Sequence, residues 1–110
     1  MRSVHFLPEV REYLDELETI LYEKGYFSYE ENSHKYVDEL VYDIKFRLPL
    51  CFHKPAPKYF EKYGEGMYYA TFKKNRQTTW YVFFRMYRHN DETTYQVRYI
   101  ANNHTVAQHL

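Results

Sequence analysis

Two arginines stand in the middle of stretches whose side chains alternate as they do in β-strands. Arg85 lies in TTWYVFFRMY, residues 78–87, and Arg98 lies in TYQVRYI, residues 94–100. Successive side chains of a strand point to opposite faces of a sheet. Burying an arginine costs much free energy unless it is paired, and its planar guanidinium can bind phosphate oxygens bidentately. The pattern therefore indicates a functional, polar sheet face.

The charge of the chain is divided between its halves, although the formal net charge is zero. Residues 1–50 carry 11 acidic and 6 basic side chains (net −5), whereas residues 51–110 carry 4 acidic and 9 basic ones (net +5). The basic half contains both arginine-bearing strands, which favours an anionic ligand on that side. The alternative is that the acidic excess only marks solvated helical faces.

The composition predicts one packed domain spanning residues 1–110. Hydrophobic residues make up 45% of the chain and aromatic residues 21%, enough for a core of ordinary size. The single cysteine, Cys51, excludes an internal disulfide and fits a reducing compartment. No stretch approaches the roughly 20 apolar residues of a membrane span, and the first ten residues lack the apolar run of a signal peptide. We therefore expect a cytoplasmic protein with no membrane partner.

Two helices are predicted near the start of the chain. A short strand, residues 3–7, precedes a helix at residues 8–24, where apolar side chains recur at helical spacing. Ser28 and Glu31 predict a capping box at the start of a second helix, which ends before Pro49. Because the link is short, the two helices should form an antiparallel hairpin.

The remaining elements form the sheet that carries the arginines. Residues 50–66 predict a loop with one helical turn in KYFEKY, because Pro55 and Pro57 exclude a regular element. Another strand follows at residues 67–73, before the two arginine-bearing strands, giving the order β-α-α-β-β-β. The fold class is α+β, with the helical hairpin on one face of a mostly antiparallel sheet. The open face should carry Tyr69, Thr71, Lys73, Tyr81, Phe83, Arg85, Tyr87, Gln96, Arg98 and Ile100.

The element order, the residues PEVREYL after the first strand and the run WYVFFRMY…YQVRYIANNH resemble the RelE/ParE superfamily of bacterial toxins. These toxins belong to two-component, type II toxin–antitoxin systems. In the ribonuclease branch, the open sheet face binds mRNA in the ribosomal A site, and basic residues on the sheet promote its cleavage. The resemblance implies a toxin that inhibits translation, with a cognate antitoxin and ribosome-bound mRNA as partners.

By position, the resemblance implies a metal-independent endoribonuclease with four catalytic residues: Lys73, Arg85, Arg98 and His104. Cleavage through the 2′-hydroxyl of RNA needs a base, charge at the scissile phosphate and an acid for the leaving oxygen. The arginines supply charge, and Lys73 adds charge or acts as a base. His104 supplies the acid or base, because histidine titrates at about pH 6.5. Further RNA contacts are expected from Lys74, Arg76, Tyr81 and Tyr87, the tyrosines by stacking on bases.

Each assignment has a structural alternative. Arg85 and Arg98 are structural if they pair with carboxylates in a closed sheet, and His104 is structural if it bonds to backbone at the strand end. The lysines and Arg76 fit a solvated hairpin tip, and abundant tyrosines often pack in a core. The functional alternatives are a gyrase-inhibiting toxin without nuclease activity and a degenerate member that only binds its antitoxin.

The histidines predict neither a metal centre nor a cofactor site. His53, His89 and His109 have no partners at ligand spacing, and His5 and His34 fit ordinary surface or packing positions. The sequence also contains no nucleophilic triad, glycine-rich phosphate loop or zinc signature.

Overall fold

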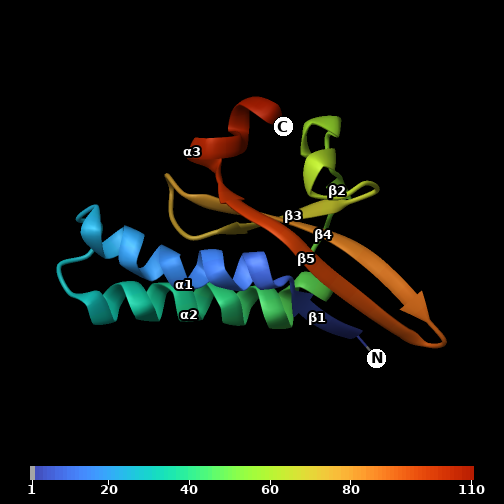
Figure 1. The fold of residues 1–110 in the computed structure, drawn as a ribbon, viewed down its shortest axis with the longest axis horizontal. Helices are drawn as coiled ribbons and strands as arrows, with labels where there is room; N and C mark the ends of the chain where they lie inside the picture. Colours follow the sequence, from blue (N-terminus) through green and yellow to red (C-terminus); the bar gives the residue numbers. More distant parts are fainter. Residues whose placement is uncertain (1) are drawn as a thin grey trace.

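Five strands form one sheet, in the order β1-β5-β4-β3-β2, in the computed structural model, which describes residues 2–110 (Figure 1). The long strands β4 (Thr79–His89) and β5 (Glu92–Asn102) pair antiparallel, as do β3 (Tyr68–Lys73) with β4 and β2 (Lys54–Pro55) with β3. Only β1 (Arg2–Phe6) lies parallel to its neighbour, β5, within the described part of the chain. The predicted α+β fold with a mostly antiparallel sheet is confirmed.

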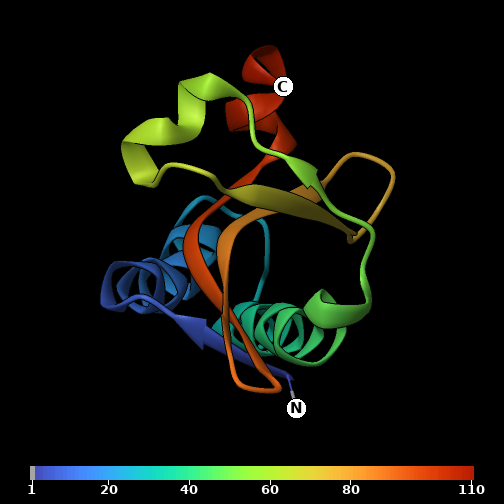
Figure 2. The ribbon, with the colours of Figure 1, turned by 90° about the vertical axis from the view of Figure 1, so that its right-hand side faces the viewer.

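The helices α1 (Pro8–Glu23) and α2 (Glu30–Arg47) form the predicted hairpin and cover one face of the sheet (Figures 1 and 2). Gly25, at φ +77°, adopts the left-handed conformation that lets the chain leave α1. The helices bury Val10, Leu14, Leu17, Val37, Leu40 and Ile44 against Ala70, Phe72, Trp80, Val82, Phe84, Tyr95, Val97 and Ile100 of the sheet. The apolar periodicity of both helices therefore predicted their buried faces.

The start of α2 differs from the predicted capping box. The residue before the helix is Tyr29, not Ser28, and no side chain caps it. A different serine forms a hydrogen bond here: the hydroxyl of Ser33 donates to the carbonyl oxygen of Glu30 at 2.7 Å. The capping box is therefore wrong, because the helix begins one residue later than the motif requires. Glu30 and Glu31 still occupy the first turn, where carboxylates interact favourably with the helix dipole.

The segment between α2 and β3 is more ordered than a loop. A 3₁₀ turn, η1 (Leu48–Leu50), leads to β2 (Lys54–Pro55), and the predicted helical turn is a 3₁₀ helix, η2 (Lys58–Tyr63). The prediction that the prolines exclude a regular element is wrong for β2. This strand lies at the edge of the sheet, where the missing N–H of a proline is tolerated.

A β-bulge in β5 changes which side chains share a face. Val97 pairs with Phe84 and Tyr99 pairs with Phe83, so Arg98 is an extra residue between them. Beyond the bulge, Ile100 packs with the helices and Tyr99 packs on the second face. The prediction that Ile100 shares the open face with Arg98 is wrong, since the two-residue period fails across an inserted residue.

The second face of the sheet is partly covered rather than open. The 3₁₀ helix η2, the short helix α3 (Asn103–Val106) and the turn η3 (Ala107–His109) lie over it (Figure 2). Phe60 of η2 is fully buried and stacks on Phe83 with ring centroids 4.3 Å apart. Val106 of α3 joins the same cluster. The prediction of a bare second face is therefore wrong over this area.

Among the residues that the structure describes, no helix is both long and apolar enough to cross a membrane.

Candidate functional site

The two arginines lie on adjacent strands and are linked through one glutamine. Arg85 pairs in register with Gln96, and Nη1 of Arg98 donates to Oε1 of Gln96 at 2.6 Å. The Tyr87 hydroxyl donates to the same oxygen at 3.5 Å, and the Arg85 guanidinium lies 5.3 Å from the centre of the Tyr87 ring. We call these four residues, Arg85, Tyr87, Gln96 and Arg98, the arginine cluster.

Neither arginine of the arginine cluster forms an ion pair with a carboxylate in the part of the chain that the structure describes. Within residues 2–110, the ion pairs join His34 to Glu18 and Asp38, and Lys74 to Glu39, and none involves Arg85 or Arg98. The structural alternative, in which Arg85 and Arg98 pair with carboxylates, is therefore wrong for the described residues.

Arg98 is held in place by neutral acceptors. Its Nε donates to the carbonyl oxygen of Tyr63 at 2.6 Å, in addition to the bond from Nη1 to Gln96. The next residue, Gly64, has φ +151°, and a Cβ placed on it would lie 2.6 Å from Nε of Arg98. The end of η2 therefore rests directly on the guanidinium, and only glycine allows this approach.

A cavity of about 580 Å³ opens beside Arg98, between the start of α1, β5, the end of η2 and α3. Ligand pockets usually have volumes of about 300–1,000 Å³. We call it the tyrosine cavity, because three tyrosines line it together with Arg98, Glu9 and Thr105: Tyr13, Tyr63 and Tyr99. Thr105 of α3 lines the cavity, whereas His104, on the same helix, does not.

The tyrosines of the cavity are partly removed from water. The rings of Tyr63 and Tyr99 stack with centroids 3.9 Å apart. The pKa of Tyr99 is raised well above its ordinary value. Burial is the larger cause and a hydrogen bond with Tyr63 is the second. Burial also raises the pKa of Tyr13. The phenols of Tyr13 and Tyr99 therefore stay protonated at neutral pH and act as neutral hydrogen-bonding groups.

Lys73 and His104 lie away from the arginine cluster. Lys73 pairs with Thr79 at the start of β4, and Arg85 is six residues further along that strand, or about 20 Å at roughly 3.4 Å per residue. The amide of Thr79 donates to the Asn103 side chain at 2.9 Å, which places α3 at the same end of the sheet. His104 is exposed on α3. The structure thus divides the four predicted catalytic residues between two places.

The four predicted RNA-contact residues are also dispersed. Lys74 turns toward the helices, where Nζ lies 3.8 Å from Oε2 of Glu39 and 5.0 Å from the centre of the Tyr36 ring. Arg76 is exposed in the loop between β3 and β4, and Tyr81 is half-buried next to the ring of Tyr69. Tyr87 is the one of these four that lies in the arginine cluster.

Sequence reasoning missed the tyrosine cavity and the residues that fix Arg98. Tyr13, Tyr63 and Tyr99 come from separate elements, and the bulge turns Tyr99 to the opposite face from the one its alternation indicates. The signal that could have found the contact with Arg98 is the pair of glycines after KYFEKY, since a glycine often marks a close backbone approach.

Comparison with protein-family models, curated proteins and solved structures finds no match to this chain. The RelE/ParE resemblance therefore stays a prediction that depends on the residues quoted for it and on the order of the elements.

Proposed function

We propose that the chain is the toxin of a two-component toxin–antitoxin system and that it inhibits translation by binding and cleaving mRNA on the ribosome. The observation that carries the proposal is the arginine cluster, in which two guanidinium groups on adjacent strands lack carboxylate partners among residues 2–110. The helical hairpin between the first strand and a run of antiparallel strands adds support, because the RelE/ParE resemblance implies that arrangement, although the short edge strand β2 is an addition to the predicted β-α-α-β-β-β order.

The arginine cluster suits an RNA phosphate. A guanidinium has five N–H donors and stays charged at physiological pH, so the two bonds that fix Arg98 leave other donors for phosphate oxygens. Charge-assisted hydrogen bonds from the guanidinium groups to phosphate oxygens would hold the backbone of the RNA in place. Exposed Tyr87 offers a ring for base stacking, and the adjacent tyrosine cavity offers room for an unstacked base.

Cleavage also needs proton transfer, which we assign to His104. Its imidazole is exposed on α3, beyond the end of β5. Because His104 and Lys73 lie at the other end of the face from Arg85, cleavage would take place at that end, within reach of the general acid or base, and the arginine cluster would hold a phosphate of another nucleotide. A single strand must therefore run across the second face to contact both groups.

The same separation favours a second candidate function, which is inhibition by binding without cleavage. A toxin of this kind would hold its target at the arginine cluster and need no acid or base. Inhibition of gyrase belongs to this class.

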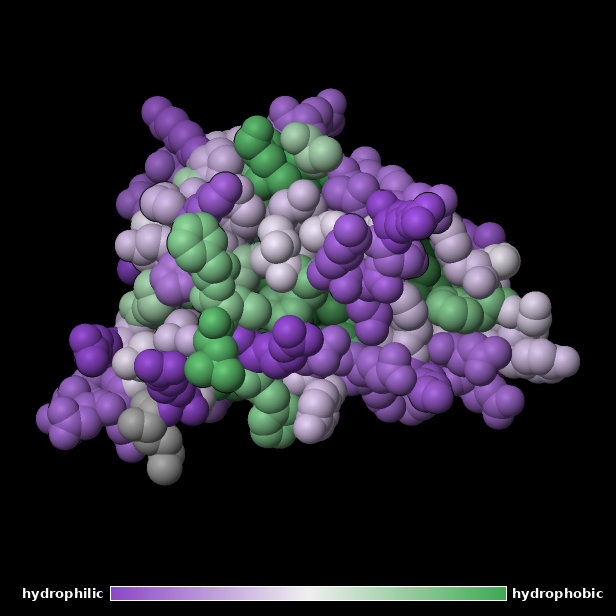
Figure 3. Space-filling view, turned by 180° about the vertical axis from the view of Figure 1, so that it is seen from behind, coloured by the Kyte–Doolittle hydropathy of each residue, from purple (hydrophilic) through white to green (hydrophobic). Residues whose placement is uncertain are grey.

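A cognate antitoxin is the proposed protein partner. Large hydrophobic side chains are exposed from the end of α2 through the segment that follows, with exposed fractions of 58% for Phe46, 77% for Leu50 and 83% for Phe52. Figure 3 shows hydrophobic atoms reaching the surface as a narrow strip with hydrophilic groups on both sides. Exposed apolar groups with a polar rim are typical of protein-binding surfaces, and antitoxins commonly wrap their toxins with a helix or an extended segment.

Induced expression in bacteria tests the proposal, with growth, protein synthesis, DNA synthesis and mRNA integrity measured together. The wild type should arrest growth and protein synthesis and leave cleaved mRNA, whereas Arg98→Gln and His104→Ala should not. Arg88→Gln is the matched control and should remain toxic, because Arg88 is exposed on the same strand as Arg85 but alternation places it on the other face.

The remaining outcomes separate the candidates. Arrest of DNA synthesis with intact mRNA would favour gyrase inhibition. Arrest of protein synthesis by His104→Ala without cleavage would favour inhibition by binding alone. Normal growth of cells that accumulate the wild-type protein would contradict the toxin proposal.

A further inference from the structure

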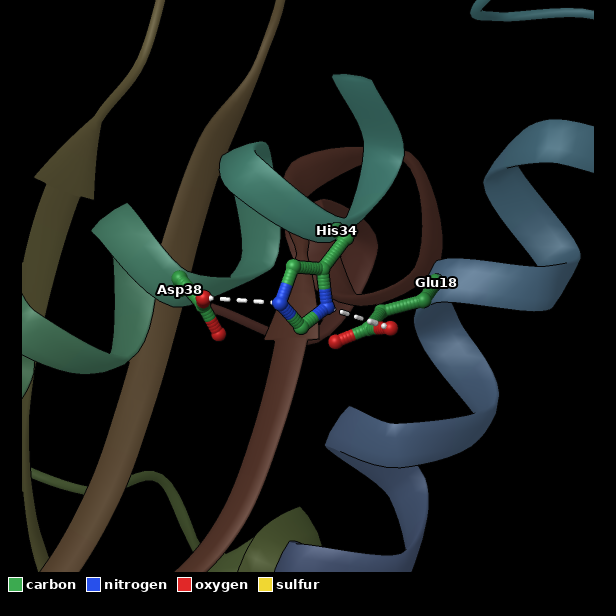
Figure 4. Close-up of side chains that lie close together, drawn as sticks. All are labelled: Glu18, His34 and Asp38. Atoms are coloured by element: carbon green, nitrogen blue, oxygen red, sulfur yellow. Dashed lines mark ion pairs between the residues drawn. The ribbon is translucent and has the colours of Figure 1, made fainter. Parts of the chain in front are cut away.

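A histidine lies between two carboxylates on the helical hairpin, away from the arginine cluster (Figure 4). Nδ1 of His34 lies 2.9 Å from Oε2 of Glu18, and Nε2 lies 3.1 Å from Oδ2 of Asp38. Glu18 comes from α1, whereas His34 and Asp38 come from α2. One ligand atom from each of the three residues lies within 4.8 Å of the other two.

The spacing of His34 and Asp38 suits two ligands of one metal ion. They are four residues apart on α2, so their side chains lie on the same helical face. Two atoms bonded at about 2.0–2.1 Å to a tetrahedral zinc ion lie roughly 3.3 Å apart, close to the observed 3.1 Å between Nε2 and Oδ2. An imidazole ligand favours zinc, copper or nickel over magnesium or calcium.

Glu18 lies where a metal-binding histidine usually has its hydrogen-bond acceptor. A carboxylate that accepts a proton from one ring nitrogen leaves the other nitrogen free to bind a metal and fixes the ring orientation. Glu18 faces Nδ1, so it directs the lone pair of Nε2 toward Asp38 (Figure 4). Its side chain is 27% exposed, compared with 61% for His34, which makes it the more confined partner.

We propose that Nε2 of His34 and the carboxylate of Asp38 bind a divalent transition-metal ion such as Zn²⁺, with Glu18 as the positioning residue and water completing the coordination. Binding requires that His34 lose the proton that its two carboxylates otherwise favour. The ion would link His34 and Asp38 within α2, and the contact of Glu18 with His34 would connect this site to α1. The proposal does not depend on the proposed toxin function, and it revises the expectation that His34 is an ordinary surface residue.

Thermal unfolding of the full chain with increasing Zn²⁺ tests the site, with Mg²⁺ as the comparison ion. The wild-type Tm should rise with Zn²⁺ and not with Mg²⁺, since only the folded chain holds His34 and Asp38 on one face of α2 with Glu18 positioning the ring. The rise should be lost in His34→Gln and Asp38→Asn and reduced in Glu18→Gln. His89→Gln is the matched control, because it removes another exposed histidine and should respond like the wild type. An equal Tm rise in His34→Gln would overturn the proposal.

Paramagnetic broadening locates the ion independently of stability. Substoichiometric Cu²⁺ added to isotope-labelled protein should broaden NMR signals around His34 and Asp38 first and leave those signals sharp in His34→Gln. Broadening that begins at another histidine, with the signals around His34 unaffected, would place the metal elsewhere and refute the proposal. Because broadening does not depend on Tm, this measurement remains informative for a variant whose Tm is changed by the substitution itself.

Discussion

The two faces of the sheet are built from different side chains and serve different ends. The face under the helices buries aliphatic residues, Trp80 and Phe84 in one large cluster. The second face buries a smaller cluster, covered by η2 and α3, and next to it leaves two arginines without acidic partners among residues 2–110. The comparison indicates that stability comes mainly from the helical face, whereas the second face keeps charge and a cavity available.

Substitution on the helical face should have the largest effect on stability. Leu40 is fully buried in α2, so Leu40→Ala removes apolar contacts and leaves a cavity. We expect the free energy of unfolding to fall by about 2–5 kcal/mol, measured by urea denaturation with circular dichroism. Toxicity per folded molecule should be unchanged. A loss below 1 kcal/mol would contradict the view that this face dominates stability.

Gly64→Ala should weaken both stability and function, because Gly64 lies against the side chain of Arg98 on the second face. The backbone at φ +151° disfavours alanine, and the new Cβ would meet Nε of Arg98. We expect a loss of about 1–3 kcal/mol in the free energy of unfolding, together with weaker RNA binding, because Arg98 must move. Gly66→Ala is the control, since a Cβ there has open space at a similarly left-handed φ of +68°. Equal RNA binding by both variants would show that Gly64 does not position Arg98.

Alkaline pH should destabilise the tyrosine cavity. Burial raises the pKa of Tyr99 in the folded protein above that in the unfolded chain, so folding favours the protonated phenol. This stability is fully present below about pH 10, the unfolded pKa, and is lost as pH rises from there toward the folded pKa. Thermal unfolding of the wild type and Tyr99→Phe between pH 8 and 11 measures it. The phenylalanine variant should lose less Tm over this range, and parallel curves would contradict the shift.

Arg85→Gln should have the smallest effect on stability. Arg85 is half-buried and has no ion pair among residues 2–110, so its removal exposes no unpaired acid. We expect a change within about 0.5 kcal/mol in the free energy of unfolding. RNA binding should nevertheless weaken and depend less steeply on salt, because each phosphate contact contributes to the slope of affinity with salt. A large loss of stability would make Arg85 a structural residue instead.

The fold could be predicted because its elements carry strong periodic signals. The stripe of Val37, Leu40 and Ile44 repeats every three or four residues, and all three side chains are buried. The two long strands alternate over enough residues to be recognised, and β4 keeps its alternation throughout.

The site could be predicted only in part, because much of it depends on contacts that leave no periodic trace. One inserted residue at Arg98 reverses the faces of everything beyond it in β5, and no local pattern marks the insertion. The cover provided by η2 follows from long-range packing of Phe60 on Phe83. The bond between Glu18 and His34 exists only because the hairpin brings two helices together.

Cleavage of ribosome-bound mRNA in a purified translation system is the most direct test of the role of the second face. Wild-type protein and Arg88→Gln should cleave the message, whereas a protein carrying both Arg85→Gln and Arg98→Gln should neither cleave nor bind it, although it remains folded by circular dichroism. Full cleavage by the double variant would contradict the central claim that the arginine cluster holds the RNA.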